Sequence, residues 1–394
     1  MSARYFLAVV LVCLFSTSAY AGEALTIVGV DLYPSPGAEP LQGVNIEIED
    51  GKISNIGQSR RGKLLDGKGL SASYGFWNSH VHFTQPRLEH DPQGVLNDML
   101  LAYGFTQVLD TGSWLQQTLA LKDMIEKGAL RGPRIHTANG SLVYRHGTPA
   151  YLPEDLQLPE ATSPALGADL VREFLGQGAD GIKIFSGSFQ SPTETIYLPV
   201  NVISAISDAA HAGDSFVVAH PTTLQGLAHA VEGGVDVIAH TTSSGSVIPA
   251  AILQQMQSSN VAVIPTLSLW RYEMMKHTGK KFIADAVEND AVVQLRQLLD
   301  ADIEILFGTD VGYMTDYDTR REYLLMAKAG MDWPAIHQAL TVAPARRFSS
   351  AAAIVEVGAP ANLVLLKGDP GQDITALARV THTIVDGEVM YSAP

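Results

Sequence analysis

The sequence predicts an α/β fold in which a (β/α)8 TIM barrel carries a small β-sandwich domain built from the N- and C-terminal segments. Three observations support this fold class. In the middle of the chain, eight short apolar runs alternate with longer segments of helical periodicity. At both ends, short β-like runs are separated by glycine-containing turns. No glycine-rich phosphate loop follows the first apolar run of the middle region, which makes an open doubly wound sheet the less favoured alternative.

The composition is typical of a globular protein with a large core. Of 394 residues, 46% are hydrophobic and 17% are charged, which excludes a disordered chain. The length suits one barrel of ~250 residues with a smaller appendage. Acidic residues outnumber basic residues by 41 to 26, and the formal net charge is −15. Because nucleic-acid binding needs a basic surface, we do not expect nucleic acid as a partner.

The first 21 residues are typical of a secretory signal peptide. Arg4 precedes an apolar run over residues 6–15, which is too short to span a bilayer, since a spanning helix needs ~20 residues. Ala19-Tyr20-Ala21 then matches the small-x-small pattern of a cleavage site. We therefore predict a signal peptide over residues 1–21 and a periplasmic or extracellular location. A buried N-terminal helix is the alternative.

The only cysteine, Cys13, lies inside this segment, so the mature chain is expected to contain no thiol. This excludes thiol nucleophiles and cysteine-based zinc sites, and it suits an oxidising compartment. No later stretch reaches the ~20 apolar residues of a membrane span, so we expect no membrane anchor in the mature form.

The terminal segments predict strands and hairpins. Near the N-terminus, two runs of alternating apolar and polar residues flank Asp50-Gly51, a hairpin turn signal. Near the C-terminus, a strand over Ala361–Leu366 precedes a hairpin around Asp386-Gly387. The predicted domains are residues 22–74 together with 349–394 for the composite β-sandwich, and residues 75–348 for the barrel.

The barrel strands are predicted from runs dense in Val, Ile and Phe, as expected for strands buried on both faces. The eight runs are Phe76–His80, Thr106–Asp110, Arg134–Ala138, Gly181–Phe185, Phe216–His220, Val235–His240, Val261–Leu267 and Glu304–Asp310. Each run and the helical segment after it form a right-handed crossover unit. Active residues are then expected at the C-terminal strand ends.

Six polar side chains stand on these strands or at their ends. In His80-Val81-His82, both imidazoles point to the same side of an extended chain, so both can reach one metal ion. The others are Lys183, His220, His240 and Asp310. Taken singly, each could have a purely structural role instead of binding metal. It could be a polar residue at an exposed strand end, part of a buried ion pair, a hydrogen-bonded histidine or a helix cap. Taken together, they meet at one barrel mouth and predict a metal site, with Zn2+ favoured by its nitrogen and carboxylate donors.

The chain resembles the amidohydrolase superfamily, and most closely its prolidase-like and carboxypeptidase-like metal-dependent hydrolases, with imidazolonepropionase as a relative. The matching stretches are Gly75-Phe76-Trp77-Asn78-Ser79-His80-Val81-His82, Gly178-Ala179-Asp180-Gly181-Ile182-Lys183, His220, Gly234-Val235-Asp236-Val237-Ile238-Ala239-His240, Gly308-Thr309-Asp310 and the tail Val357-Gly358-Ala359-Pro360-Ala361-Asn362-Leu363-Val364-Leu365-Leu366. They cover nearly all of the chain after the signal segment.

The resemblance implies two divalent metal ions, most consistent with Zn2+. One ion is held by His80, His82 and Asp310, and the other by His220 and His240. Lys183, carboxylated on its side-chain nitrogen (N6), bridges the two. A single-metal site with an unmodified lysine stays open.

Three positions depart from the family pattern. Asn78 stands where an aspartate is common, Thr222 where a second histidine often follows, and Asn362 where the closing segment often has an acid. None of them removes a metal ligand of the pattern.

The implied function is hydrolysis of a C–N (amide or peptide-like) bond in a small substrate such as a dipeptide or an N-acyl amino acid. A metal-activated hydroxide attacks, and Asp310 serves as general base and then as general acid. Six residues in the loops after the strands are candidate substrate contacts: Tyr144, Arg145, His146, Trp270, Arg271 and Tyr313. An arginine among them would clamp a carboxylate, and the aromatics would hold an apolar side chain. Loop packing and solvated charge are the alternative for each arginine.

Two other functions remain open at this stage. The same metal centre can open a cyclic amide, a lactone or a phosphotriester, because the loops decide the substrate. A catalytically inactive barrel that serves as a binding protein is the alternative of another class. The expected partner is a small molecule, and the sequence leaves homo-oligomerisation open.

Overall fold

The structure is a computed structural model that describes residues 24–243, 245, 247–348 and 352–394. The predicted signal peptide over residues 1–21, with Cys13, lies outside the described residues. Within the described residues, no helix has both the length and the apolar character that crossing a bilayer requires.

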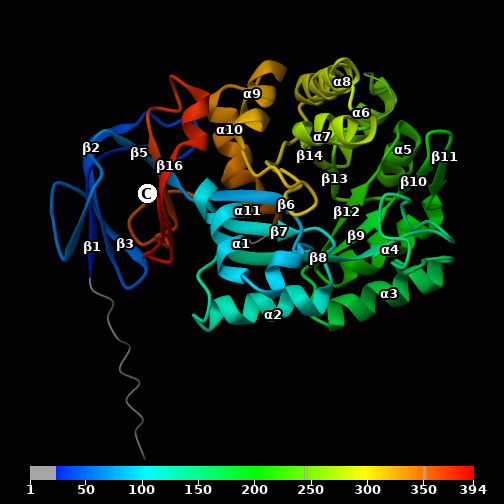
Figure 1. Cartoon of the computed structure of the whole chain (residues 1–394), viewed down its shortest axis with the longest axis horizontal. Coiled ribbons are helices and arrows are strands. Elements are labelled where there is room, and N and C mark those ends of the chain that lie inside the picture. Colours follow the sequence, from blue (N-terminus) through cyan, green and yellow to red (C-terminus); the bar gives the residue numbers. More distant parts are fainter. Residues whose placement is uncertain (1–23, 244, 246, 349–351) are drawn as a thin grey trace, which may run out of the picture.

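The middle of the chain forms a parallel barrel (Figure 1). Seven strands follow one another around it in sequence order. They are β6 (Phe76–Val81), β7 (Phe105–Asp110), β8 (Arg134–Leu142), β9 (Gly181–Phe185), β12 (Phe216–His220), β13 (Val237–Ala239) and β14 (Ala262–Ile264). The parallel α/β barrel that the sequence predicted is therefore confirmed, with somewhat different strand ends.

The eighth predicted strand, Glu304–Asp310, is not a regular strand. It still closes the barrel, because Leu306 N donates to Val263 O (2.9 Å) on one side and Ser79 N donates to Phe307 O (2.8 Å) on the other. Gly308 explains the irregularity: a Cβ atom there would lie 2.3 Å from a methyl group of Ile264. The segment passes too close to β14 for a side chain, so its backbone bends where the other strands run straight.

Helices cover the outside of the barrel (Figure 1). They are α1 (Pro92–Met99), α2 (Leu115–Glu126), α3 (Pro164–Gly176), α4 (Val200–Ala212), α5 (Leu224–Glu232), α6 (Ala250–Ser258), α7 (Leu267–Thr278), α8 (Lys281–Asp300), α9 (Arg320–Ala329), α10 (Trp333–Leu340) and α11 (Val342–Phe348). Several begin at a side-chain cap followed by proline; for example, the Ser163 side chain accepts from Leu166 N and Pro164 opens α3. A short hairpin that the sequence did not predict, β10 (Gly187–Ser191) and β11 (Glu194–Tyr197), follows β9.

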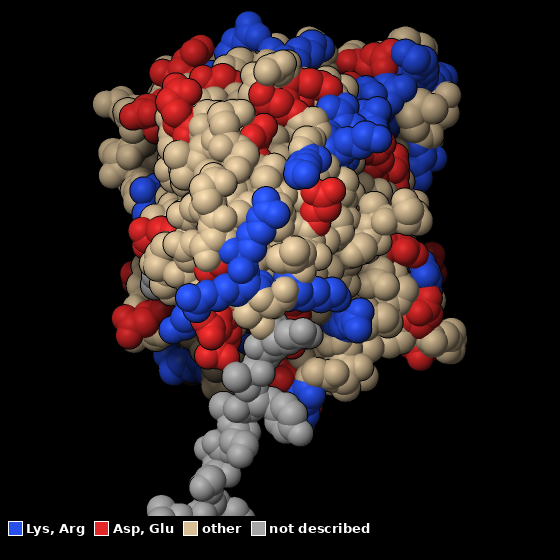
Figure 2. Space-filling model, turned by 90° about the vertical axis from the view of Figure 1, so that its left-hand side faces the viewer, with Lys and Arg blue, Asp and Glu red and all other residues tan. Residues whose placement is uncertain are grey.

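The two ends of the chain combine into an additional mixed sheet of eight strands, apart from the sheet of the barrel. Its strands are β1 (Leu25–Leu32), β2 (Leu41–Glu49), β3 (Lys52–Gly57), β4 (Lys63–Asp66), β5 (Leu70–Tyr74), β15 (Leu363–Lys367), β16 (Val380–Val385) and β17 (Glu388–Ser392). The antiparallel pairing of β5 with β15 joins the N-terminal strands to the C-terminal strands. Acidic and basic side chains alternate over the face of the molecule seen in Figure 2.

Strand β15 is buried on both faces. Leu363 and Leu365 belong to the apolar cluster that contains Ile27 and Ile46 of the terminal sheet. The alternate residues Val364 and Leu366 belong to the other apolar cluster, which contains Phe76 of the barrel. Because successive residues of a strand point to opposite faces, this one strand packs against both parts of the molecule.

We expect Leu366→Ala to lower the free energy of unfolding by about 2–5 kcal/mol, because it leaves a cavity where both parts meet. Lys367→Ala is the matched control, since Lys367 is the next residue and is exposed; we expect a change within about 0.5 kcal/mol for it. Urea denaturation of both variants measures the difference. Equal stabilities would contradict the packing role given to β15.

Candidate metal centre

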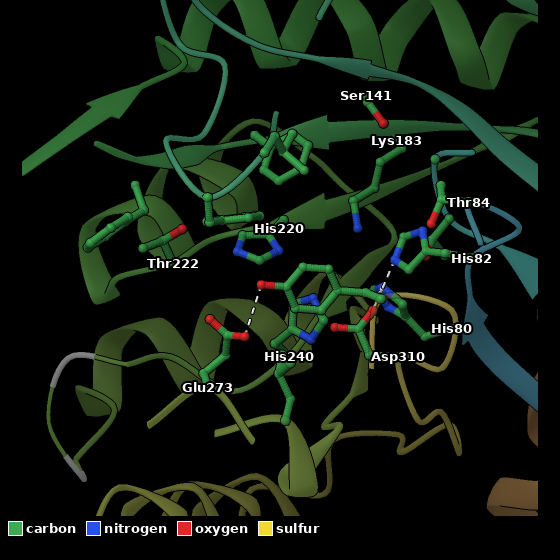
Figure 3. A pocket seen from close by; sticks show the side chains of 18 of the residues that line it. His80, His82, Thr84, Ser141, Lys183, His220, Thr222, His240, Glu273 and Asp310 are labelled. Atoms are coloured by element: carbon green, nitrogen blue, oxygen red, sulfur yellow. Dashed lines mark hydrogen bonds and ion pairs between the residues drawn. The ribbon is translucent and has the colours of Figure 1, made fainter. Parts of the chain in front are cut away.

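A pocket of ≈330 Å³ opens at the C-terminal ends of the barrel strands (Figure 3). All six side chains that the sequence analysis grouped as metal ligands line it: His80, His82, Lys183, His220, His240 and Asp310. The pleat of β9 explains how a lysine comes to be there. Ile182 and Ile184 pack into the outer apolar layer, so the side chain between them points into the barrel.

The four imidazoles form a continuous row. Ring centroids are 5.2 Å apart between His82 and His80, 4.6 Å between His80 and His240, and 4.6 Å between His240 and His220. These residues come from three different strands, which are far apart in the sequence. The arrangement brings eight imidazole nitrogens into one small volume.

Asp310 meets this row at the end formed by His82 and His80. Its Oδ1 atom lies 2.9 Å from Nε2 of His82 and 3.3 Å from Nε2 of His80. One ligand atom from each of His80, His240 and Asp310 lies within 4.8 Å of the others. The Nδ1 atom of His80 and the Oδ1 atom of Asp310 are buried, and neither has a hydrogen-bond partner that satisfies full geometric criteria. Such a group of lone-pair donors fits a divalent cation.

Burial keeps the imidazoles of His80, His220 and His240 neutral. Desolvation lowers the pKa of His80 to about 3, although the nearby Asp310 carboxylate works in the opposite direction. Desolvation also holds the pKa values of His220 and His240 well below the ordinary value. For Asp310, burial raises the pKa but the surrounding histidines outweigh it, so its pKa is well below the usual range. Neutral imidazole and ionised carboxylate are the forms that bind metals.

Lys183 is a buried amine, with only 2% of its surface exposed. Desolvation lowers its pKa to about 8, partly opposed by Asp310 and Asp110. Its ammonium nitrogen faces the ring of Phe185 at 5.7 Å from the centroid. A lysine in this state releases its proton far more readily than a solvated one.

The metal-ligand candidates are held in place by polar partners. Nδ1 of His240 lies 2.6 Å from the Thr266 hydroxyl, which leaves Nε2 free for the pocket. The Asn78 amide donates to the Thr309 hydroxyl (2.6 Å), and its oxygen accepts from His80 N (3.2 Å). Asn78, which stands where the family commonly has an acid, thus links the first strand to the segment that carries Asp310.

Several pocket residues have left-handed backbone conformations. The φ angles are +45° for Ser141, +57° for Thr222, +70° for His240 and +64° for Asp310. A non-glycine residue pays ~1–2 kcal/mol for this conformation, although aspartate and histidine tolerate it better than most. The strained residues lie where strands end and loops begin, and each lines the pocket. This clustering is typical of functional sites.

The candidate substrate contacts divide into two groups. Trp270 and Tyr313 line the pocket. Four residues are not among the described lining residues: Tyr144, Arg145, His146 and Arg271. Arg145 and His146 are exposed, and Tyr144 packs beside the apolar core. No arginine at all is among the described lining residues, so the predicted carboxylate clamp is absent from this wall.

Helix α7 explains the error over Arg271. The sequence analysis placed Trp270-Arg271-Tyr272 in a loop, but the helix already begins at Leu267. Residues spaced three or four apart share a helix face, so Trp270, Glu273 and His277 face the pocket together. Arg271 lies off that face and pairs with Asp285 of α8.

Sequence reasoning missed most of the pocket wall. The missed apolar and aromatic residues are Trp114, Tyr151, Leu152, Leu156, Leu158, Phe185, Phe189, Leu269 and Met274. Tyr151 and the three leucines that follow it lie in the long segment between β8 and α3, which has no apolar periodicity to read. Of these residues, only those of α7 could have been found from the sequence, through the helical spacing described above.

A model of the amidohydrolase family matches residues 73–390. A crystal structure of a Xaa-Pro dipeptidase with methionine bound in its active site matches at 24% identity with a TM-score of 0.80, covering 94% of this chain and 100% of that one. A crystal structure of a putative prolidase from Bifidobacterium longum matches at 26% sequence identity with a TM-score of 0.78, covering 93% of this chain and 94% of that one. The crystal structure of A. niger ochratoxinase matches at 17% sequence identity with a TM-score of 0.76, covering 95% of this chain and 96% of that one. No curated protein matches the sequence.

Glu322 of α9 holds the start of α7. Its two carboxylate oxygens accept from Leu267 N (2.7 Å) and Ser268 N (2.8 Å), one turn before the pocket residues of that helix. Glu322 is buried, and desolvation outweighs these hydrogen bonds and raises its pKa from 4.5 to about 7. Folding therefore favours the protonated form of Glu322. The stability that this protonated carboxyl contributes is fully present below pH 4.5, and it is lost as the pH rises through 7.

We expect the unfolding free energy of the wild type, relative to that of Glu322→Gln, to fall by about 2–3 kcal/mol between pH 5 and pH 8. The other titrating groups are common to both proteins and cancel in this difference. Chemical denaturation at the two pH values measures it. A difference that stays constant would show that folding leaves the pKa of Glu322 unchanged, and one that grows with pH would show that folding lowers it.

Proposed function

This chain belongs to the amidohydrolase family, and from that premise we propose that it hydrolyses the C–N bond of a small amide with a large apolar group, at a centre of two divalent metal ions. The family and its prolidase neighbours make the chain a hydrolase of C–N bonds. The observation that carries the finer proposal is the convergence of four imidazoles, a carboxylate and a lysine in one pocket. Zn2+ is the ion that we propose, because it prefers these donors.

In this proposal, His80, His82 and Asp310 would hold one ion, and His220 and His240 would hold the other. Lys183 would be a ligand of both ions as a carbamate anion, which forms when its neutral amine adds to the carbon of CO2 and releases one proton. The lowered pKa of Lys183 supports this step, since only the unprotonated amine reacts. The carbamate also helps to neutralise two divalent charges in a buried place.

Bound divalent ions supply Lewis acidity, which polarises the amide carbonyl and lowers the pKa of water towards ~7. Asp310 takes one proton from the water that adds to the carbonyl carbon. As the C–N bond breaks, Asp310 passes this proton to the departing nitrogen, and the products are a carboxylic acid and an amine. Thr266 and Asn78 hold His240 and the Asp310 segment in place during the reaction.

The pocket wall favours substrates with a bulky apolar or aromatic group. Trp114, Phe189 and Trp270 supply aromatic surface, and leucines of the β8–α3 segment complete it. We propose dipeptides or N-acyl amino acids with an apolar side chain as substrates, bound through apolar contact rather than through an arginine clamp. The signal segment supports a further proposal, that the enzyme acts in the periplasm or outside the cell.

A substrate panel tests the function. The zinc-loaded protein, containing about two ions per chain, is expected to cleave dipeptides and N-acyl amino acids with apolar side chains, and to lose activity when a chelator removes the metal. Cyclic amides, lactones and phosphotriesters serve as competing classes. Activity that survives complete removal of metal, or turnover of phosphotriesters alone, would refute the proposal. One ion per chain with full activity would overturn its two-metal part.

Asp310→Asn tests the proton transfer. Asparagine tolerates the left-handed backbone at this position, so we expect the fold to survive while kcat falls by about 10²–10⁴. Circular dichroism and metal content serve as controls, because a loss of bound metal would mimic a loss of catalysis. Wild-type kcat in a metal-loaded variant would rule out the role given to Asp310.

A further inference from the structure

The pocket contains a second carboxylate, that of Glu273 on α7. Its side chain is 14% exposed. Among the described lining residues, Lys183 is the only lysine and no arginine is present, so His277 is the only one outside the metal-centre group that can carry a positive charge. The proposed metal centre assigns no role to this carboxylate.

Glu273 and Asp310 stand on different sides of the pocket (Figure 3). The dashed line at Glu273 marks the hydrogen bond that the Tyr313 hydroxyl donates to its Oε1 atom, at 2.9 Å. Burial raises the pKa of Tyr313, and Glu273 and Asp310 both add to this shift. The same two carboxylates raise the pKa of the buried Tyr151. Both tyrosines therefore keep their protons and remain hydrogen-bond donors.

The remaining partners of Glu273 do not neutralise it fully. His277 Nε2 lies 3.1 Å from Oε2, and the Lys276 ammonium lies 3.9 Å from Oε1. Both side chains are about half exposed, so water screens their charges. A carboxylate has about four acceptor sites, so Glu273 can still accept from a ligand in the pocket.

We propose that Glu273 determines specificity by binding a cationic group of the substrate, an alkylammonium or a guanidinium. This inference rests on the proposed function in one respect: the scissile amide sits at the metal centre while the cation reaches Glu273. A charge pair in a water-poor, apolar pocket is stronger than the same pair at the surface. The nearby aromatic rings of Tyr313 and Tyr151 also favour a cation.

The substrate class becomes narrower as a result. It combines a C–N bond, a large apolar group and a positive charge, as in an aminoacyl amide with a free amine or in an amide with a basic side chain. Among the substrates of the proposed function, this favours dipeptides, which have a free amine, over N-acyl amino acids with an apolar side chain, whose only charge is a carboxylate that Glu273 would repel. The competing explanation is that Glu273 merely fixes Tyr313 and His277 in place.

Glu273→Gln separates these explanations, because its amide oxygen can still accept from Tyr313 while the negative charge is lost. Isothermal titration of the zinc-loaded protein at pH 7 measures binding of 2-phenylethylamine, 2-phenylethylguanidine and the neutral 2-phenylethanol. We expect at least one of the two cations to bind wild type about tenfold or more tightly than the alcohol. In Glu273→Gln this preference is expected to disappear, while binding of the alcohol changes less than about twofold.

Asp285→Asn is the matched control, since it removes the same charge from a residue that is not among the described lining residues. It should leave the preference unchanged. Equal affinity of wild type for the cations and the alcohol, a preference that survives in Glu273→Gln, or an equal loss in Asp285→Asn would each overturn the inference. Binding needs no turnover, so cation binding without amide hydrolysis would count against the proposed function alone. Amide hydrolysis without a Glu273-dependent preference would count against the inference alone.

Discussion

Everything at the barrel mouth depends on the removal of water from a group of imidazoles. Desolvation is the largest cause of the low pKa values of His80, His220 and His240. Neutral rings packed side by side expose their lone pairs to one another and to a single carboxylate, an arrangement that brings little stability by itself. It becomes favourable when divalent cations fill the space between the donors. The same loss of water that makes the site costly to fold therefore makes it selective for metal.

The supporting contacts show how a barrel supplies such a site. Asn78 and Thr266 stand on neighbouring parts of the barrel wall and fix ligand candidates through short hydrogen bonds. The left-handed residues at the strand ends turn the chain so that side chains enter the pocket. Glu322 anchors the helix whose face forms the opposite wall. The candidate metal ligands thus stand on or next to rigid strands. The part of the pocket wall that would contact the substrate is formed by a helix and a long loop.

Much of the fold could be predicted from the sequence, because apolar runs alternate with helical segments in the middle of the chain and β-like runs stand at both ends. The candidate ligands could be grouped because each stands on a predicted strand or near its end. The alternation of side chains along a strand also puts His80 and His82 on one side.

The prediction of a regular strand failed at Glu304–Asp310, where Gly308 packs close to β14. The arrangement of the terminal strands depends on pairing between distant segments, which the sequence pattern does not specify. Arg271 was placed in a loop, although it lies inside α7, and the wall around Tyr151 has no periodic pattern.

The pairing of β5 with β15 has a consequence for the order of folding. Tyr74 pairs with Leu363, so the terminal sheet joins strands from opposite ends of the polypeptide. Until the last segment has been synthesised, the edge of β5 that pairs with β15 in the folded chain has unsatisfied amides and carbonyls. Such an edge invites pairing with another chain. Contacts of such long sequence separation also form slowly, because a large loop must close first. Nascent chains therefore pass through a period in which the barrel can assemble while its neighbouring sheet is still open to aggregation.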